Sequence, residues 1–188
     1  MDHYFKKMKI KLINLKSARS TNDEAIKLIK KNKEIPSIIF TENQTKGRGT
    51  MGKKWISFSG NFFITIFFEL KKNMPNFKEF SVLNPLILKK LLSRYTNLNI
   101  KIKKPNDLLI NNNKVCGILQ ETLKIEKKLF LVIGVGVNTI ISPKSENIKA
   151  ISLKESSKVI VKNLDILENL KDEYEKIFLN YKLNKCFL

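Results

Sequence analysis

The most informative stretch of this sequence is a basic, glycine-rich run that reads Lys46-Gly47-Arg48-Gly49-Thr50-Met51-Gly52-Lys53-Lys54-Trp55. Its glycines free the backbone to adopt positive φ and to approach a ligand closely. Its lysines and its arginine supply charge for phosphate or carboxylate groups. Taken alone, the run is equally well explained as a surface turn of a basic protein. It is not the nucleotide-binding P-loop, because the G-x-x-x-x-G-K-[ST] pattern fails after Gly52.

Apolar periodicity on both sides of this run predicts strands and helices. Strands are expected at residues 9–15, 36–41, 61–70, 99–103, 108–110, 114–125 and 129–138. Helices are expected at residues 21–33, 78–95 and 163–181. A capping box from Thr21 to Glu24 should start the first helix, and Pro85 either kinks the second or marks its first turn. Consecutive hairpin strands with a few helices predict an α+β fold with a mixed or antiparallel sheet.

The composition fits one globular domain. The chain has 188 residues, of which 43% are hydrophobic and 28% charged, and this length buries about 70% of the unfolded surface. The net charge of +19 favours anionic partners electrostatically. However, the lysines are spread along the chain and are not interleaved with aromatic residues, as a nucleic-acid platform requires. A solvated lysine surface is therefore predicted.

Cysteine and histidine usage excludes several kinds of site. His3 is the sole histidine, which argues against His-based zinc sites and Ser-His-Asp catalysis. Cys116 and Cys186 form no disulfide framework, so free thiols in a reducing cytosol are expected. The first ten residues are polar, and the longest apolar run, residues 62–68, is too short to span a bilayer. We therefore expect a cytoplasmic protein that does not associate with membranes.

Further motifs stand in a fixed order around the glycine-rich run. They read Ser20-Thr21-Asn22, then Lys103-Lys104-Pro105-Asn106-Asp107, Lys114-Val115-Cys116-Gly117-Ile118-Leu119 and Gly134-Val135-Gly136-Val137-Asn138. Together the blocks resemble S-T-N, Q-x-x-G-R-G-x-x-G-x-x-W, K-W-P-N-D, K-x-x-G-I-L and G-x-G-x-N in the catalytic domain of biotin–protein ligases. The resemblance covers roughly residues 10–180, nearly the whole chain.

This resemblance implies a fold, an activity and partners. The fold would be a class II synthetase-like α+β domain, with a mixed, largely antiparallel sheet and helices on one face. The enzyme would use ATP with Mg²⁺ to form biotinyl-5'-AMP, and would transfer biotin to a specific lysine of a biotin carboxyl carrier protein. It would act as a monomer or homodimer, without specific nucleic acid. Residues 1–188 would form a single catalytic domain, lacking an N-terminal DNA-binding domain and the small C-terminal β-domain.

The resemblance also assigns roles to individual residues. Arg48, Lys114 and Asp107 match catalytic positions, the first two as cations for carboxylate and phosphate oxygens and Asp107 beside the incoming amine. The expected biotin contacts are Ser20, Thr21, Asn22, Gln44, Gly47, Arg48, Lys114 and Gly117. The expected ATP or adenylate contacts are Arg48, Gly49, Lys53, Trp55, Asn106, Lys114 and Asn138. No protein metal ligand is assigned.

Residue type alone leaves simpler interpretations open. Ser20 to Asn22 equally fit helix capping, and Asp107 equally fits a turn. Lys114 would otherwise be an ordinary hairpin lysine, while Gly134 and Gly136 would mark a buried strand that needs space.

The sequence also departs from the family pattern at several positions. Thr50 and Met51 replace basic residues of the loop, and Lys104 replaces tryptophan before Pro105. The charge of the loop is then left to Arg48, Lys53 and Lys54, and one wall of the site would be more open. Two other functions remain as alternatives: a lipoate– or octanoate–protein ligase of the same fold, and a basic nucleic-acid-binding protein.

Overall fold

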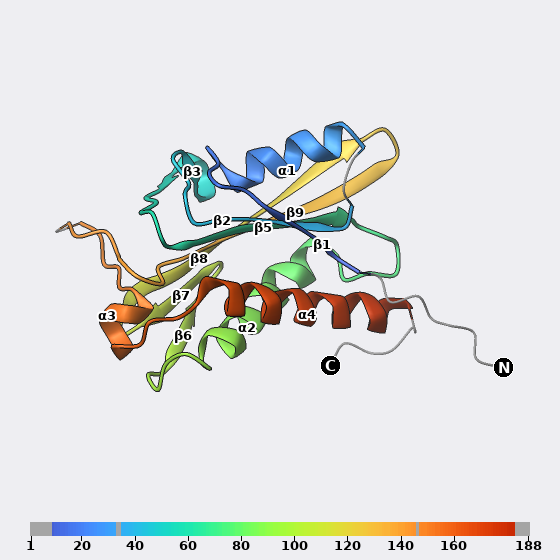
Figure 1. Ribbon diagram of the computed structural model, residues 1–188. Coiled ribbons are helices and arrows are strands. Elements are labelled where there is room, and N and C mark those ends of the chain that lie inside the picture. The colour runs from blue at the N-terminus through green and yellow to red at the C-terminus, as the bar shows by residue number, and fades with distance from the viewer. Residues whose placement is uncertain (1–8, 33–34, 146, 183–188) are drawn as a thin grey trace.

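A seven-stranded mixed sheet forms the centre of the molecule (Figure 1). The structure, a computed structural model, describes residues 9–32, 35–145 and 147–182. The strand order is β1-β2-β5-β9-β8-β7-β6, in which β1 and β2 are parallel and the other neighbours antiparallel. The strands are β1 (Lys11–Asn14), β2 (Ser37–Thr41), β5 (Phe62–Glu69), β6 (Ile100–Lys103), β7 (Asp107–Ile110), β8 (Asn113–Ile125) and β9 (Lys128–Val137). The predicted mixed, largely antiparallel sheet is confirmed.

Helices cover both faces of this sheet. They are α1 (Thr21–Lys30), α2 (Phe77–Leu92), α3 (Leu153–Ser157) and α4 (Asn163–Lys182). Figure 1 shows α2 and α4 together on one side of the sheet and α1 on the other. One core cluster joins Ala25 and Ile29 of α1 to Phe67 and Val132, whereas the alternate strand residues pack in the larger cluster with α2 and α4.

The position of α1 differs from the expectation that helices lie on one face. Successive side chains of a strand point to opposite faces, and β5 carries the run Phe62–Glu69, which is apolar on both. Such a strand needs cover on each side. The amphipathic helix α1 supplies it through Ala25 and Ile29, which are fully buried.

The start of α1 differs from the sequence prediction, and the start of α2 decides between the two roles left open for Pro85. The N-cap of α1 is Ser20, whose hydroxyl accepts from the Asp23 amide at 3.4 Å, so the expected Thr21 capping box is wrong. The amide of Thr21 instead donates to Gln44 Oε1 at 3.0 Å. The second helix starts from a capping box at Asn76, which leaves Pro85 in its interior rather than its first turn. The last expected helix is confirmed as α4.

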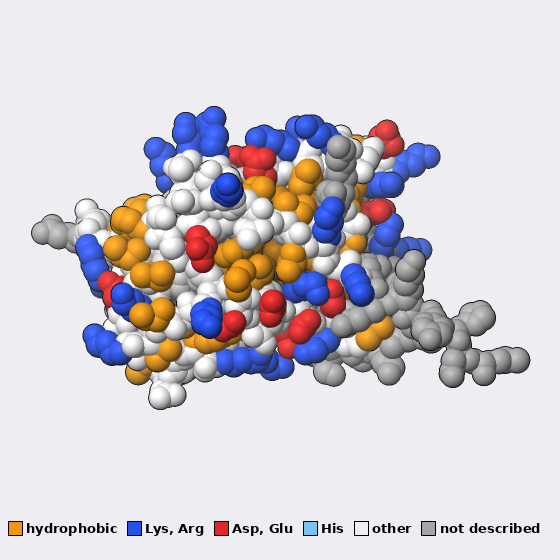
Figure 2. Space-filling view, viewed as in Figure 1, with side chains coloured by type: hydrophobic (Ala, Val, Ile, Leu, Met, Phe, Trp, Pro, Cys, Tyr) orange, Lys and Arg blue, Asp and Glu red, His pale blue; other side chains and the backbone are white. Residues whose placement is uncertain are grey.

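The predicted lysine surface and the free thiol of Cys116 can be compared with the structure, whereas two other predictions concern residues outside the described range. Figure 2 shows lysine and arginine side chains scattered over the visible face rather than gathered in one patch, as expected for a solvated lysine surface. Cys116 is free and buried, and burial raises the pKa of its thiol, so it is unreactive. Cys186 and His3 lie outside the described residues. None of the described helices carries an apolar stretch long enough to cross a membrane.

A carboxylate that the sequence analysis did not single out holds the segment between β9 and α3. Glu155 Oε2 accepts from Ser142 Oγ at 2.7 Å and from the Ser152 amide at 2.8 Å, and Oε1 pairs with Lys144 Nζ at 2.7 Å. Partial burial alone would raise the pKa of Glu155, but the hydrogen bonds from Lys144, Ser142 and Ser152 outweigh it and lower that pKa to about 2. The ionised carboxylate therefore stabilises the fold.

We expect Glu155→Gln to destabilise the protein by about 1 kcal/mol at neutral pH. Because the folded pKa lies below the ordinary value of 4.5, the contribution is fully present above that pH. The difference from wild type should therefore shrink as the pH falls from 4.5 towards about 2. Urea unfolding at a series of pH values measures this, with Glu168→Gln on the exposed side of α4 as the matched control. A difference that stays constant with pH contradicts the assignment.

Candidate active site

Two adjoining cavities lie beside the glycine-rich loop, which folds into β3 (Gly47–Arg48), a short 3-10 turn (Thr50–Gly52) and β4 (Lys54–Trp55). The first cavity has a volume of about 130 Å³ and the second about 200 Å³. Lys54, Trp55 and Lys114 line both. The predicted site residues that line the first cavity are Ser20, Thr21, Asn22, Gln44, Arg48, Gly49, Lys53, Trp55, Asn106, Lys114 and Gly117.

Three predicted site residues lie outside the first cavity. Asn138 lines the second cavity, and Asp107 is paired with Lys114. Gly47 is buried under the loop, where a Cβ atom would approach Gln44 Nε2 at 2.7 Å and the Trp55 carbonyl at 2.8 Å. Residue 47 must therefore be a glycine, because a side chain there would clash with Gln44 and with the backbone of Trp55.

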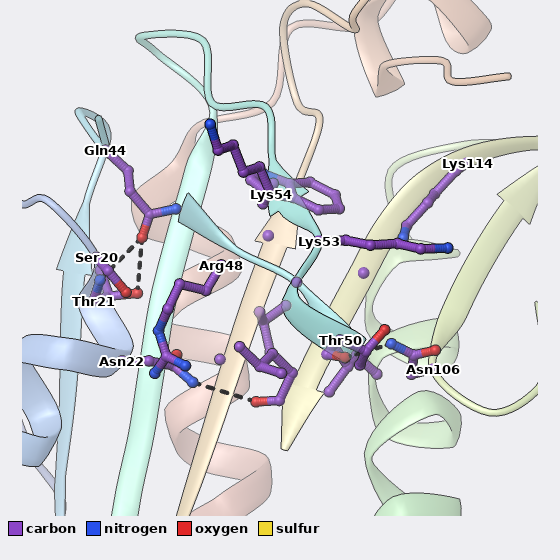
Figure 3. A pocket seen from close by; sticks show the side chains of 18 residues that line it. Ser20, Thr21, Asn22, Gln44, Arg48, Thr50, Lys53, Lys54, Asn106 and Lys114 are labelled. Carbon is purple, nitrogen blue, oxygen red and sulfur yellow. Dashed lines mark hydrogen bonds between the residues drawn. The ribbon is translucent and has the colours of Figure 1, made fainter. Parts of the chain in front are cut away.

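Neutral polar side chains form one wall of the first cavity. Asn22 is only 4% exposed; its Nδ2 donates to Glu121 Oε2 at 2.7 Å, and its Oδ1 accepts from Thr65 Oγ1 at 2.6 Å. Gln44 Oε1 accepts from Thr21, and Gln44 Nε2 donates to Ser57 Oγ at 3.2 Å. Figure 3 shows Gln44 and the Ser20 to Asn22 turn on one side, opposite Lys53, Asn106 and Lys114. This wall is preorganised for a ligand with a neutral polar group.

Glycines of β8 and β9 form the floor of the cavity. A Cβ atom on Gly134 would collide with the side-chain amide of Asn22. On Gly136 it would meet the Trp55 indole at 2.6 Å, and on Gly117 it would meet both Trp55 and Lys114. The G-x-G pattern therefore does mark a strand that needs space, and the side chains that fill the space line the first cavity.

Gly134→Ala should destabilise the fold by about 1–3 kcal/mol, because overpacking forces a buried side chain from its position. Asn22 cannot give way cheaply, since Glu121 and Thr65 hold its amide on both sides. Chemical unfolding measures the loss. In the background of Asn22→Ala, which removes the obstructing amide, the same substitution should cost clearly less. If Gly134→Ala lowers the free energy of unfolding equally in wild type and in Asn22→Ala, the added methyl group does not clash with Asn22.

The guanidinium of Arg48 is held by carboxylates. Its Nη1 and Nη2 donate to the two oxygens of Glu121, each at 2.7 Å, and its Nε lies 2.9 Å from Asp23 Oδ1. The Glu121 hydrogen bonds raise the pKa of Arg48 against the opposing effect of partial burial, and Asp23 adds to this. Arg48 and Asn22 share Glu121 Oε2, so the guanidinium lies beside the neutral wall. Figure 3 shows Lys114 on the opposite side of the pocket.

Lys114 lies where the two cavities meet. Its Nζ is 2.6 Å from Asp107 Oδ1 and 5.2 Å from the centre of the Trp55 ring. Strands β7 and β8 bring the pair together, because Asp107 is in register with Gly117, and a bulge follows at Leu108/Leu109. Asn106 Nδ2 donates to the Ile118 carbonyl at 2.7 Å and fixes the turn before β7. The cation is thus mounted on a sheet strand rather than on a loop.

Two residues that line the second cavity carry buried polar atoms without a hydrogen-bond partner among the described residues. Asn138 is 2% exposed, and its Nδ2 donates to the Lys114 carbonyl at 3.3 Å. Its Oδ1 is buried and has no hydrogen-bond partner among the described residues, and the same is true of Trp55 Nε1. Buried polar groups are normally hydrogen-bonded, so both atoms are candidates for contacts with a ligand. Apolar Pro143 and Ile148, with Lys149, complete this cavity.

Sequence reasoning missed several of these residues. Glu121 and Asp23 gave no signal, because Asp23 was explained by helix capping and Glu121 lies among polar residues of a strand edge. Pro143, Ile148, Lys149 and Ala150 belong to no motif and line the second cavity only because of the fold. Gly134 and Gly136 were recognised as a pattern, and their spacing was the available signal.

The amino-acid sequence is similar to those of known proteins. The model of the biotin/lipoate A/B protein ligase family matches residues 15–138. The bifunctional ligase/repressor BirA of Bacillus subtilis is 27% identical over 169 residues, covering 86% of this chain and 52% of that protein. The biotin–[acetyl-CoA-carboxylase] ligase of Paracoccus denitrificans is 32% identical over 132 residues, covering 66% and 52%. The chain spans about half the length of these curated relatives.

Solved structures show the same fold. The biotin protein ligase of Aquifex aeolicus, in complex with biotin and ATP, has a TM-score of 0.76 and 26% identity, covering 93% of this chain and 73% of that chain. The LipL1 protein of Plasmodium falciparum, in complex with lipoate, has a TM-score of 0.62 at 15% identity, covering 96% and 64%, and shares the fold alone.

Proposed function

The chain belongs to the biotin/lipoate A/B protein ligase family, and we propose that it is a biotin–protein ligase that uses ATP. The reaction joins biotin to AMP as biotinyl-5'-AMP and then transfers biotin to a lysine of a biotin carboxyl carrier protein. One observation carries the proposal: two cavities meet at Lys114, a cation that lines both. Two anionic substrates that must react with each other need such a junction.

The first cavity suits biotin. The neutral polar wall of Thr21, Asn22 and Gln44 matches the uncharged ring system of biotin, which presents amide-like donors and an acceptor. The biotin carboxylate then extends towards Lys114. The second ligand of the family, lipoate, carries a disulfide ring without such donors, so this polar wall favours biotin.

The second cavity suits the nucleotide. The unpartnered Oδ1 of Asn138 is an acceptor for the amino group of adenine. Pro143 and Ile148 offer apolar contact to the base, and Lys54 and Lys149 offer charge to phosphates.

The reaction proceeds in two steps around Lys114. A carboxylate oxygen of biotin attacks the α-phosphorus of ATP, and the bond to the pyrophosphate leaving group breaks. Lys114 stabilises the charge that grows on the phosphate oxygens. In the second step the lysine amine of the carrier attacks the acyl carbon and AMP leaves, with Asp107 accepting the proton of the amine.

Magnesium would accompany ATP rather than occupy a site built by the protein. Among the described residues there is no group of three or more His, Cys, Asp or Glu side chains that could hold a metal ion. Carboxylate Asp107 is engaged by Lys114. Mg²⁺ that accompanies ATP is usually bound mainly through phosphate oxygens and water.

Biotin-dependent exchange of pyrophosphate into ATP tests the proposal. We expect exchange with biotin, little with lipoate or octanoate, and labelling of a biotin carboxyl carrier protein on a single lysine. Exchange driven by lipoate or octanoate instead would assign the chain to the other branch of the family. Absence of exchange with every acid, together with salt-sensitive binding to DNA or RNA, would favour a nucleic-acid-binding protein.

A further inference from the structure

The glycine-rich loop is too small to hold its own shape. Strands β3 and β4 contribute two residues each, and Gly47 pairs with Trp55 while Arg48 pairs with Lys54. An isolated two-stranded ribbon is marginal in water even at greater length. At the tip, Met51 is 94% exposed with a φ of 55°. The loop must therefore be held by its contacts with the rest of the molecule.

Two side chains tie this loop to the sheet and to α1. Trp55 lies on the glycines of β8 and β9, next to Lys114. Arg48 reaches in the other direction, to Glu121 on β8 and Asp23 in the first turn of α1. Because Glu121 also accepts from Asn22, one carboxylate links the loop, the strand and the polar wall of the first cavity.

We propose that Glu121 is a positioning residue that acts through Arg48 to hold the glycine-rich loop closed over the first cavity. The catalytic consequence rests on the proposed ligase function, whereas the loop position does not. A guanidinium has five N–H donors in one plane, and a bidentate carboxylate fixes the orientation of that plane. Arg48 is thereby committed to bracing the loop beside the polar wall, and Lys54 and Lys114 are the cations that line both cavities.

Asp23 has a lesser part in the same cluster. It approaches Nε of Arg48 through one oxygen, whereas Glu121 binds both terminal nitrogens. Asp23 is also more exposed, with 45% of its side chain accessible against 27% for Glu121. Exposed pairs contribute less than well-aligned bidentate pairs. Loss of Glu121 should therefore release the loop more than loss of Asp23.

Trp55 provides a direct measurement of loop position, because it is the single tryptophan of the chain. In the ligand-free protein, Glu121→Gln should raise the acrylamide quenching of Trp55 fluorescence towards the level of Arg48→Ala. Asp23→Asn should raise it less. The control Glu126→Gln, at the exposed turn between β8 and β9, should behave as wild type. Circular dichroism confirms that each variant is folded.

A double variant tests whether Glu121 affects Trp55 quenching through Arg48. In the Arg48→Ala background, Glu121→Gln should add little further quenching, because the contact it removes is already lost. Additive effects of the two substitutions overturn the proposal, since Glu121 would then act independently of Arg48. Unchanged quenching in Glu121→Gln alone overturns it as well.

Enzyme kinetics give the second readout. A loosened loop weakens retention of biotin, so Glu121→Gln should raise KM for biotin roughly tenfold, the effect of one lost charge-assisted hydrogen bond. The exchange rate at saturating biotin should fall by less. A loss confined to the saturated rate overturns the positioning role. If wild type shows no biotin-dependent exchange, the proposed function fails, and the quenching experiment still decides whether Glu121 positions the loop.

Discussion

Lys114→Ala should lower the rate of biotin-dependent ATP–pyrophosphate exchange by about a hundredfold or more at saturating substrates. A fixed charge aimed at the developing charge of a transition state is worth about 3 kcal/mol. Lys114 lines both cavities, and its strand holds it in place. Its loss should affect the saturated rate more than KM, because the growing charge on phosphate exists only during the reaction.

The matched control for this prediction is Lys124→Ala. Lys124 lies on the same strand, is exposed, and lines neither cavity. Its loss changes the net charge of the protein equally, so any general electrostatic effect on ATP binding appears in both variants. Near-normal exchange in Lys114→Ala, with a fold confirmed by thermal unfolding, would remove Lys114 from the reaction and with it the main support for the proposed mechanism.

Local sequence signals were sufficient for most of the fold. The two asparagines of the predicted hairpin turn, Asn111 and Asn112, adopt positive φ, a conformation that asparagine tolerates well. The apolar run of β5 and the spacing of Phe80, Ile87 and Leu91 in α2 also gave the correct elements. These features depend on neighbouring residues along the chain, which is why they can be recognised without a structure.

The helix start at Ser20 shows where local signals were insufficient. Both Ser20 and Thr21 are good capping residues, and the capping-box spacing favoured Thr21. The choice is made by Gln44, which lies far along the chain and takes the Thr21 amide and hydroxyl. A tertiary contact of this kind leaves no trace in the pattern around the helix.

The partner of Arg48 was also missed because it is set by a tertiary contact that leaves no local signal in the sequence. Its position in the motif was clear, and a free guanidinium fork facing two anions was the simplest inference. In the structure the two terminal nitrogens of Arg48 donate to Glu121, which is 73 residues away in the sequence. No periodicity links the two, so the sequence predicted that Arg48 belongs to the site but not which group it binds.

Lys114 and Asp107 were better defined by sequence because both lie on adjacent hairpin strands. Their motifs are only a few residues apart, and the pairing of β7 with β8 brings them within 2.6 Å. The contact nevertheless raises a question about the role of Asp107. A carboxylate beside Lys114 acts either by fixing that cation or by accepting the proton of the incoming amine.

Asp107→Asn should separate these roles, and we expect transfer to fall about a hundredfold or more while adenylation falls much less. The amine of the carrier lysine must lose a proton only in the second step, and positioned proton acceptors contribute about 10²–10⁴-fold. Asparagine keeps the shape and a hydrogen-bond acceptor for Lys114 but cannot take a proton. Single-turnover transfer from preformed biotinyl-5'-AMP to the carrier measures the second step, and pyrophosphate exchange measures the first.

The size of the two losses decides what Asp107 does. If it acts mainly by holding Lys114, both half-reactions should fall together, because Lys114 stabilises charge on the phosphate in each. If it accepts the proton, transfer by the variant should recover at high pH, where the carrier amine is already deprotonated, whereas adenylation should not. Asp172→Asn, an exposed carboxylate on α4, controls for the change in net charge. Equal losses without recovery at high pH would reassign Asp107 to the support of Lys114.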